Sequence, residues 1–183
     1  MAQTQKRILF VCTGDNCRTI LARAAALKNE GPESRFIFET ASCSTESKKF
    51  VAEPKVHQSV LNAIKKKCPE EYRLIKDYVP RPLSKEMVSK MDRVYFLCSA
   101  CMDTAKELIP REYHDRMQFY CTYKSRINSR ELHEVPNPIN GNNWRDYYDR
   151  DRTTEVETDS VTLLESMISQ LHPALKTNDL SKL

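Results

Sequence analysis

The chain has 183 residues, of which 30% are charged, and a formal net charge of +4 at pH 7. This length suits one domain with a full core. The basic residues are spread along the sequence and gather in no arm or stripe, which argues against nucleic acid as a partner. The odd number of cysteines, seven, and the lack of an apolar leader after Met1 argue against secretion. The sequence has no apolar run near ~20 residues, which argues against a membrane partner. We therefore expect a cytoplasmic protein with free thiols.

Short apolar runs and helical patterns alternate along the chain. Four apolar runs have the length of strands: 8–11, 36–38, 94–97 and 117–120. Helical patterns follow them: 19–29, 54–67, 84–91, 103–108 and from 159 onward. Strands separated by helices imply right-handed crossovers and a parallel sheet. We predict one α/β domain over 1–183, and we interpret the charged, unpatterned stretch 143–158 as a mobile insertion.

The most informative segment joins the first apolar run to the first helix and reads Cys12-Thr13-Gly14-Asp15-Asn16-Cys17-Arg18-Thr19. A loop that closes on a helix N-terminus collects unpaired N–H groups and the positive end of the helix dipole, which suits a bound oxyanion. A thiol in that field is driven toward the nucleophilic thiolate, and an arginine can hold two phosphate oxygens at once. The segment therefore predicts a phosphate-binding loop over 13–18, with Cys12 as nucleophile and Arg18 as phosphate ligand. The hydroxyl of Thr19 can reach back toward the sulfur.

Two other cysteine patterns are weaker. Cys17 and Arg23 have the same spacing as Cys12 and Arg18, but Arg23 falls inside the helical pattern. Cys98 and Cys101 form a single CxxC, which could be a metal or redox pair; without a second pair at zinc spacing, we favour two small buried thiols at a strand end.

The stretch from Val11 to Thr19 resembles the phosphate loop of the low-molecular-weight protein tyrosine phosphatases. A later segment, Asn137-Pro138-Ile139-Asn140-Gly141-Asn142, is similar to the Asp-Pro-aromatic motif of that family. The resemblance runs from about Arg7 to the final helix. It implies a four-stranded parallel sheet flanked by helices on both faces, in three layers, and a phosphocysteine intermediate formed without metal or other cofactor.

The resemblance also implies roles for single residues. Cys17 would form a reversible disulfide with Cys12, Phe50 would be an aromatic wall for the substrate, and Arg81 would support the loop.

The chain departs from the family at the general acid. The family's aspartate before proline is replaced by Asn137, an amide that cannot donate a proton at neutral pH. Glu134 and Asp146 are the nearest carboxylates that could substitute, and their spacing favours neither.

Two loop positions also differ from the family. Asp15 stands where the family has asparagine, and its charge would repel a phosphate dianion unless the side chain is turned away and hydrogen-bonded. Asn16 replaces a small or apolar residue at the mouth of the loop, which leaves the substrate preference open.

Three functions are consistent with these residues. The first is a cysteine-dependent phosphatase that hydrolyses phosphotyrosine or a related phosphoester. Its substrate would be a phosphorylated protein or a small phosphoester, and its loop would also hold a phosphate or sulfate ion. The second is a phospho-residue binding protein that has lost turnover. The third is an arsenate reductase, which needs a relay of cysteines; Cys98 and Cys101 are closer in sequence than we expect of that relay.

Overall fold

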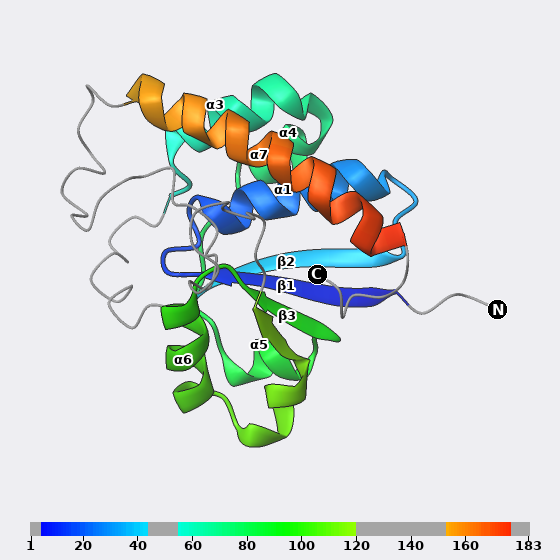
Figure 1. Ribbon diagram of the computed structural model, residues 1–183, viewed down its shortest axis with the longest axis vertical. Helices are drawn as coiled ribbons and strands as arrows, with labels where there is room; N and C mark the ends of the chain where they lie inside the picture. The colour runs from blue at the N-terminus through cyan, green and yellow to red at the C-terminus, as the bar shows by residue number, and fades with distance from the viewer. Residues whose placement is uncertain (1–4, 44–54, 120–152, 177–183) are drawn as a thin grey trace, which may run out of the picture.

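The computed structural model describes residues 5–43, 55–119 and 153–176. Four parallel strands form one sheet with the order β2-β1-β3-β4 (Figure 1). The strands have these bounds: β1 Lys6–Cys12, β2 Phe36–Ser42, β3 Arg93–Phe96 and β4 Met117–Phe119. The predicted four-stranded parallel α/β fold is therefore confirmed.

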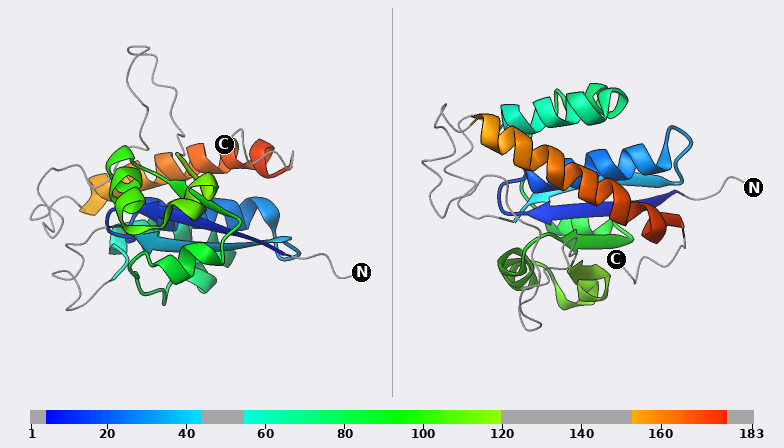
Figure 2. Two further views of the ribbon diagram at one scale, coloured as in Figure 1. Left: turned by 90° about the horizontal axis from the view of Figure 1, so that it is seen from below. Right: turned by 45° about the horizontal axis from the view of Figure 1, so that its top comes forward.

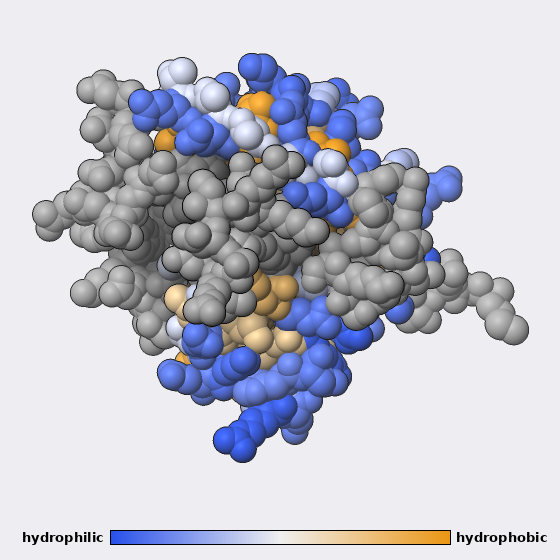
Figure 3. All heavy atoms as spheres, viewed as in Figure 1, coloured by the Kyte–Doolittle hydropathy of each residue, from blue (hydrophilic) through white to orange (hydrophobic). Residues whose placement is uncertain are grey.

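The helices cover the sheet on both faces (Figure 1). One layer holds α1 Arg18–Glu30, α3 Gln58–Lys67, α4 Pro69–Ile75 and α7 Thr153–Lys176, and the other holds α5 Lys85–Ser89 and α6 Ser99–Leu108. Hydrophilic side chains predominate on the outer surface of both layers in the face drawn in Figure 3. Within the described ranges, no helix has the length and apolar character needed to cross a membrane.

The central strand β1 is buried on both sides because its apolar residues alternate between two cores. Ile8 and Phe10 pack with α1, α3 and α7, whereas Leu9 and Val11 pack with α5 and α6. Such a continuous apolar run is typical of a strand in a covered parallel sheet. Cys12 continues the alternation and belongs to the core on the α1 side.

The prediction of an insertion up to residue 158 is wrong over its last six residues, because α7 begins at Thr153. Val156 lies on the buried face of the helix with 6% exposure, and Glu157 accepts a hydrogen bond of 3.2 Å from the side-chain amide of Asn62. The charged residues on either side of Val156, namely Glu155, Glu157 and Asp159, concealed the helical period. The rest of the predicted insertion, 143–152, lies outside the described residues.

Two further boundaries differ from the sequence prediction. Helix α3 begins at Gln58 rather than at residue 54, because His57 is its N-cap and its ring nitrogen Nδ1 accepts from the Ser59 N–H at 3.2 Å. Strand β2 extends four residues beyond the apolar run 36–38, through Thr40 and Ser42, which are polar but buried.

Candidate active site

The predicted phosphate loop lies where β1 ends and α1 begins. The carboxyl end of β1 and the amino-terminal end of α1 meet at one end of the sheet (Figure 2). Open α/β sheets bind ligands beyond the carboxyl ends of their strands. Cys12 is the last residue of β1 and is 2% exposed, so its sulfur lies at the base of the loop rather than on the surface.

The backbone of the loop offers donors for an anion. Among the hydrogen bonds that the described residues make with one another, none starts from the backbone N–H of residues 13–17. The loop leads directly into α1, whose first backbone bond runs from the Leu21 N–H to the Cys17 carbonyl at 3.0 Å. Unpaired N–H groups at a helix N-terminus form an oxyanion site.

Arg18 is the first residue of α1, and it is only 8% exposed. The guanidinium therefore does not project into solvent. A cation buried beside a loop of N–H donors suits an anionic ligand.

Thr19 connects the sulfur to the carboxylate of Asp15. The Cys12 thiol donates to Thr19 Oγ1 at 3.7 Å, and the Thr19 hydroxyl in turn donates to Asp15 Oδ1 at 2.9 Å. Both bonds are buried. The structure therefore joins these three side chains in one buried chain of hydrogen bonds.

Asp15 is turned inward and hydrogen-bonded, so its carboxylate does not face the loop mouth. Its side chain is 0% exposed, and its φ of 52° places the backbone in the left-handed region that aspartate tolerates. Besides Thr19, the Tyr78 hydroxyl donates to Oδ2 at 2.6 Å and the Arg81 N–H donates to Oδ2 at 3.1 Å. Burial raises the pKa of Asp15 above its ordinary value, although these hydrogen bonds act in the opposite direction.

Gly14 and Asn16 fit closely together in the loop. A Cβ added at Gly14 would lie 2.9 Å from Asn16 Oδ1, so the missing side chain makes room for the Asn16 amide. The Asn16 carbonyl accepts a bond of 3.1 Å from the His57 N–H, just ahead of α3.

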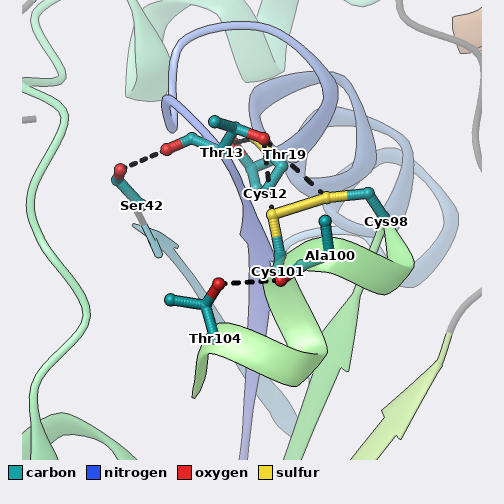
Figure 4. The surroundings of a disulfide bond; sticks show 8 residues. All are labelled: Cys12, Thr13, Thr19, Ser42, Cys98, Ala100, Cys101 and Thr104. Carbon is teal, nitrogen blue, oxygen red and sulfur yellow. Dashed lines mark hydrogen bonds between the residues drawn. A yellow bond between two sulfur atoms is a disulfide. The ribbon is translucent and has the colours of Figure 1, made fainter. Parts of the chain in front are cut away.

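The start of the loop contacts a pair of sulfur atoms. Thr13 Oγ1 lies 3.4 Å from Cys101 Sγ and 3.8 Å from Cys98 Sγ, and the Thr13 carbonyl accepts a hydrogen bond from the Ser42 hydroxyl (Figure 4). Cys98 and Cys101 are joined by a disulfide at the amino-terminal end of α6. Our expectation of two free thiols here is wrong, because the first turn of α6 holds their Cα atoms 5.5 Å apart, within reach of a disulfide.

The remaining described cysteines are free and buried: Cys12, Cys17, Cys43 and Cys68. The resemblance paired Cys12 with Cys17, and the structure keeps both as thiols. Burial, with a smaller contribution from Cys12, raises the pKa of Cys17 far above that of an ordinary thiol, and the same two causes raise the pKa of Cys43 to about 12.

Four predicted site residues lie outside the described residues: Phe50, Glu134, Asn137 and Asp146. Conversely, sequence reasoning missed Tyr78 and Ser42, which hold Asp15 and Thr13. No local pattern marks either residue. Arg81, which the resemblance named as a support for the loop, contacts Asp15 through its backbone N–H.

The family model for low molecular weight phosphotyrosine protein phosphatases matches residues 7–179 of the chain. The chain belongs to this family. Its members are cysteine-based phosphatases. The comparison with curated proteins finds no match.

Solved structures of phosphatases share the fold at low sequence identity. A low molecular weight phosphotyrosine phosphatase from Vibrio cholerae is 15% identical with a TM-score of 0.67, over 95% of this chain and 99% of that one. The tyrosine phosphatase Wzb from Escherichia coli K30, in complex with sulphate, is 13% identical with a TM-score of 0.62, over 93% and 99%. A protein tyrosine phosphatase from Entamoeba histolytica, with Hepes in the active site, is 17% identical with a TM-score of 0.58, over 93% and 99%.

Proposed function

We propose that this protein hydrolyses phosphotyrosine or a related phosphoester through a phosphocysteine formed on Cys12. The observation that carries the proposal is the position of the Cys12 sulfur at the base of a loop whose N–H groups, at residues 13–17, make no bond within the described structure. Arg18, buried at the start of α1, adds the positive charge that a phosphate needs.

In the first step the sulfur attacks phosphorus, so that an S–P bond forms as the bond to the leaving oxygen breaks. The loop N–H groups and Arg18 stabilise the three equatorial oxygens of the transferring group. In the second step water attacks the phosphocysteine, and the S–P bond breaks to release inorganic phosphate. Nothing in these two steps requires a metal or an organic cofactor.

A tetrahedral anion in the loop is the ground-state counterpart of this chemistry. The Entamoeba histolytica phosphatase holds Hepes, a sulfonate, in its active site, and the Escherichia coli protein is in complex with sulphate. We extend this property to the present chain, and expect phosphate or sulfate to compete with a phosphorylated protein or small phosphoester for residues 13–18.

The leaving oxygen needs a proton, and here the chain differs from the family pattern. Asn137 cannot supply a proton, and loss of a general acid costs about 10²–10⁴-fold in rate. An acidic leaving group tolerates this loss best. We therefore expect weak turnover of ordinary phenolic esters unless Glu134 or Asp146 acts as the acid, with Phe50 against the substrate ring.

The decisive variant is Cys12→Ser. It should abolish hydrolysis of p-nitrophenyl phosphate, since the serine hydroxyl is not ionised in this site, while binding of inorganic phosphate measured by calorimetry persists. Phosphate release that continues in the serine variant would refute a Cys12 mechanism.

A phospho-residue binding protein without turnover is the second candidate, and Asn137 is the residue that favours it. Asn137→Asp separates the two functions. A rise in kcat toward 10²-fold or more with unchanged phosphate affinity would show a phosphatase that lacks its acid. If neither the variant nor the wild-type chain turns over any aryl phosphate while both bind phosphate, binding is the function.

A further inference from the structure

The hydrogen bonds at Cys12 have a definite direction. Thr19 has one hydroxyl proton, and that proton is donated to Asp15 Oδ1 at 2.9 Å. The 3.7 Å contact between sulfur and Thr19 Oγ1 must then use a proton from the thiol. In this arrangement the Thr19 hydroxyl has no proton left to donate to the sulfur.

Asp15 accepts hydrogen bonds on both oxygens and donates none. Thr19 donates to Oδ1, while Tyr78 and the Arg81 N–H donate to Oδ2. This is the pattern of an ionised carboxylate. Because burial makes this carboxylate more basic than one on the surface, it is also a better acceptor for a further proton.

A thiolate at Cys12 and a carboxylate at Asp15, linked only through the Thr19 hydroxyl, would repel each other strongly. Both side chains are buried, and no cation among the described residues pairs directly with Asp15. Ionisable groups coupled in this way share their protons.

We propose that Cys12 and Asp15 share one proton through the hydroxyl of Thr19, so that the free protein holds its nucleophile as a thiol. This inference deepens the proposed function by naming where the thiol proton goes. As the S–P bond forms, the Cys12 proton passes to Thr19 Oγ1, and the Thr19 proton passes to Asp15 Oδ1. Asp15 becomes neutral, and the negative charge that it loses leaves on the oxygen of the departing group, while the charge of the phosphoryl group is the same before and after transfer.

The sharing of a proton with Cys12 requires an aspartate at position 15. The resemblance puts asparagine at this position in the family, and an amide takes up no proton at neutral pH. An asparagine NH₂ would instead donate to Thr19 Oγ1, and the Thr19 hydroxyl would then turn to the sulfur and stabilise the thiolate. Asp15 thus reverses the direction of the Thr19 hydrogen bond.

Other charged and titratable groups around this chain of hydrogen bonds come from every neighbouring element. They are Cys17 at the N-cap of α1, Arg18 and Arg23 on α1, Glu39 on β2, Cys43 after β2, Tyr78 and Arg81 before α5, and the Cys98–Cys101 disulfide at the amino-terminal end of α6. Arg23 stacks over the Tyr78 ring at 5.4 Å, and Glu39 is held by Arg7 and Arg81. Arg18 acts against the proposal by favouring thiolate, and the negative charge of Asp15 must outweigh it.

Asp15→Asn tests the inference, and asparagine suits the left-handed backbone at this position. The ultraviolet absorbance of the thiolate is titrated in the variant and in the wild-type chain, each corrected with its own Cys12→Ser counterpart. We expect the Cys12 midpoint to fall, and the rate of alkylation by iodoacetamide in mildly acidic buffer to rise about tenfold or more. A midpoint that stays the same or rises overturns the inference.

Glu39→Gln is the matched control, because it neutralises another carboxylate of the same region, which is partly buried and makes no bond to Thr19. We expect it to leave the Cys12 midpoint in place. A fall as large as that of Asp15→Asn would show a general loss of negative charge and overturn the specific role of Asp15. Neither measurement reads phosphatase activity, so this inference can fail while the proposed function stands.

Discussion

The start and the middle of the predicted phosphate loop are fixed in different ways. Its middle is tied inward by Asp15, which is ionisable and accepts three hydrogen bonds. Its start is tied by Thr13, which contacts Ser42 and the Cys98–Cys101 disulfide without any charge. Residues from other segments thus hold the loop through the side chains of Asp15 and Thr13, and the backbone N–H groups of the loop remain available to a ligand. The two parts of the loop should differ in what disturbs them. The middle should respond to substitution of Asp15 and to pH, and the start should respond to reduction of the disulfide beside Thr13.

The largest effect is expected from Asp15→Ala. The hydroxyls of Thr19 and Tyr78 and the Arg81 N–H would lose their acceptor together, and each buried donor without a partner costs roughly 1–3 kcal/mol. We expect the free energy of unfolding in urea to fall by about 3 kcal/mol or more. Asp15→Asn retains an oxygen acceptor and should lose clearly less. Equal losses in the two variants would contradict this account of the inward tie.

A smaller effect is expected at the start of the loop. The disulfide between Cys98 and Cys101 closes a very short loop, for which chain entropy gives about 2 kcal/mol. The double variant Cys98→Ser, Cys101→Ser should lower the free energy of unfolding by about this amount, which is measured as a lower urea midpoint. Dithiothreitol should do the same to the wild-type chain and leave the double variant unchanged. A wild-type midpoint that is insensitive to dithiothreitol would show that the disulfide adds no stability.

The pH dependence of stability should be the smallest effect, and within the loop it should come from Asp15 alone. The pKa of Asp15 is raised in the folded chain above the ordinary value of 3.8, so the folded state holds this proton more tightly than the unfolded state does. The contribution of Asp15 is then complete below pH 3.8 and is lost as the pH rises through the folded pKa. The stability of the wild-type chain minus that of Asp15→Asn should decline over this interval. A difference that increases with pH would mean that the pKa is lowered.

The sequence was sufficient for the sheet and for the position of the loop. Apolar runs such as 8–11 are local signals, and Cys12 and Arg18 bracket one strand-to-helix turn. The start of α7 was placed too late because charged residues separate Val156 from the rest of its buried face. The direction of Asp15 could not be read from the sequence at all. It depends on Tyr78, which lies 63 positions away in an irregular segment.

The bond from the His57 N–H to the Asn16 carbonyl has a mechanical consequence. His57 caps α3, and α3 packs along α7 at the far side of the same layer. The loop is thereby bonded to the outer helices as well as to the sheet. A displacement of α3 would reach the loop at Asn16, whereas Cys12 belongs to the central strand β1.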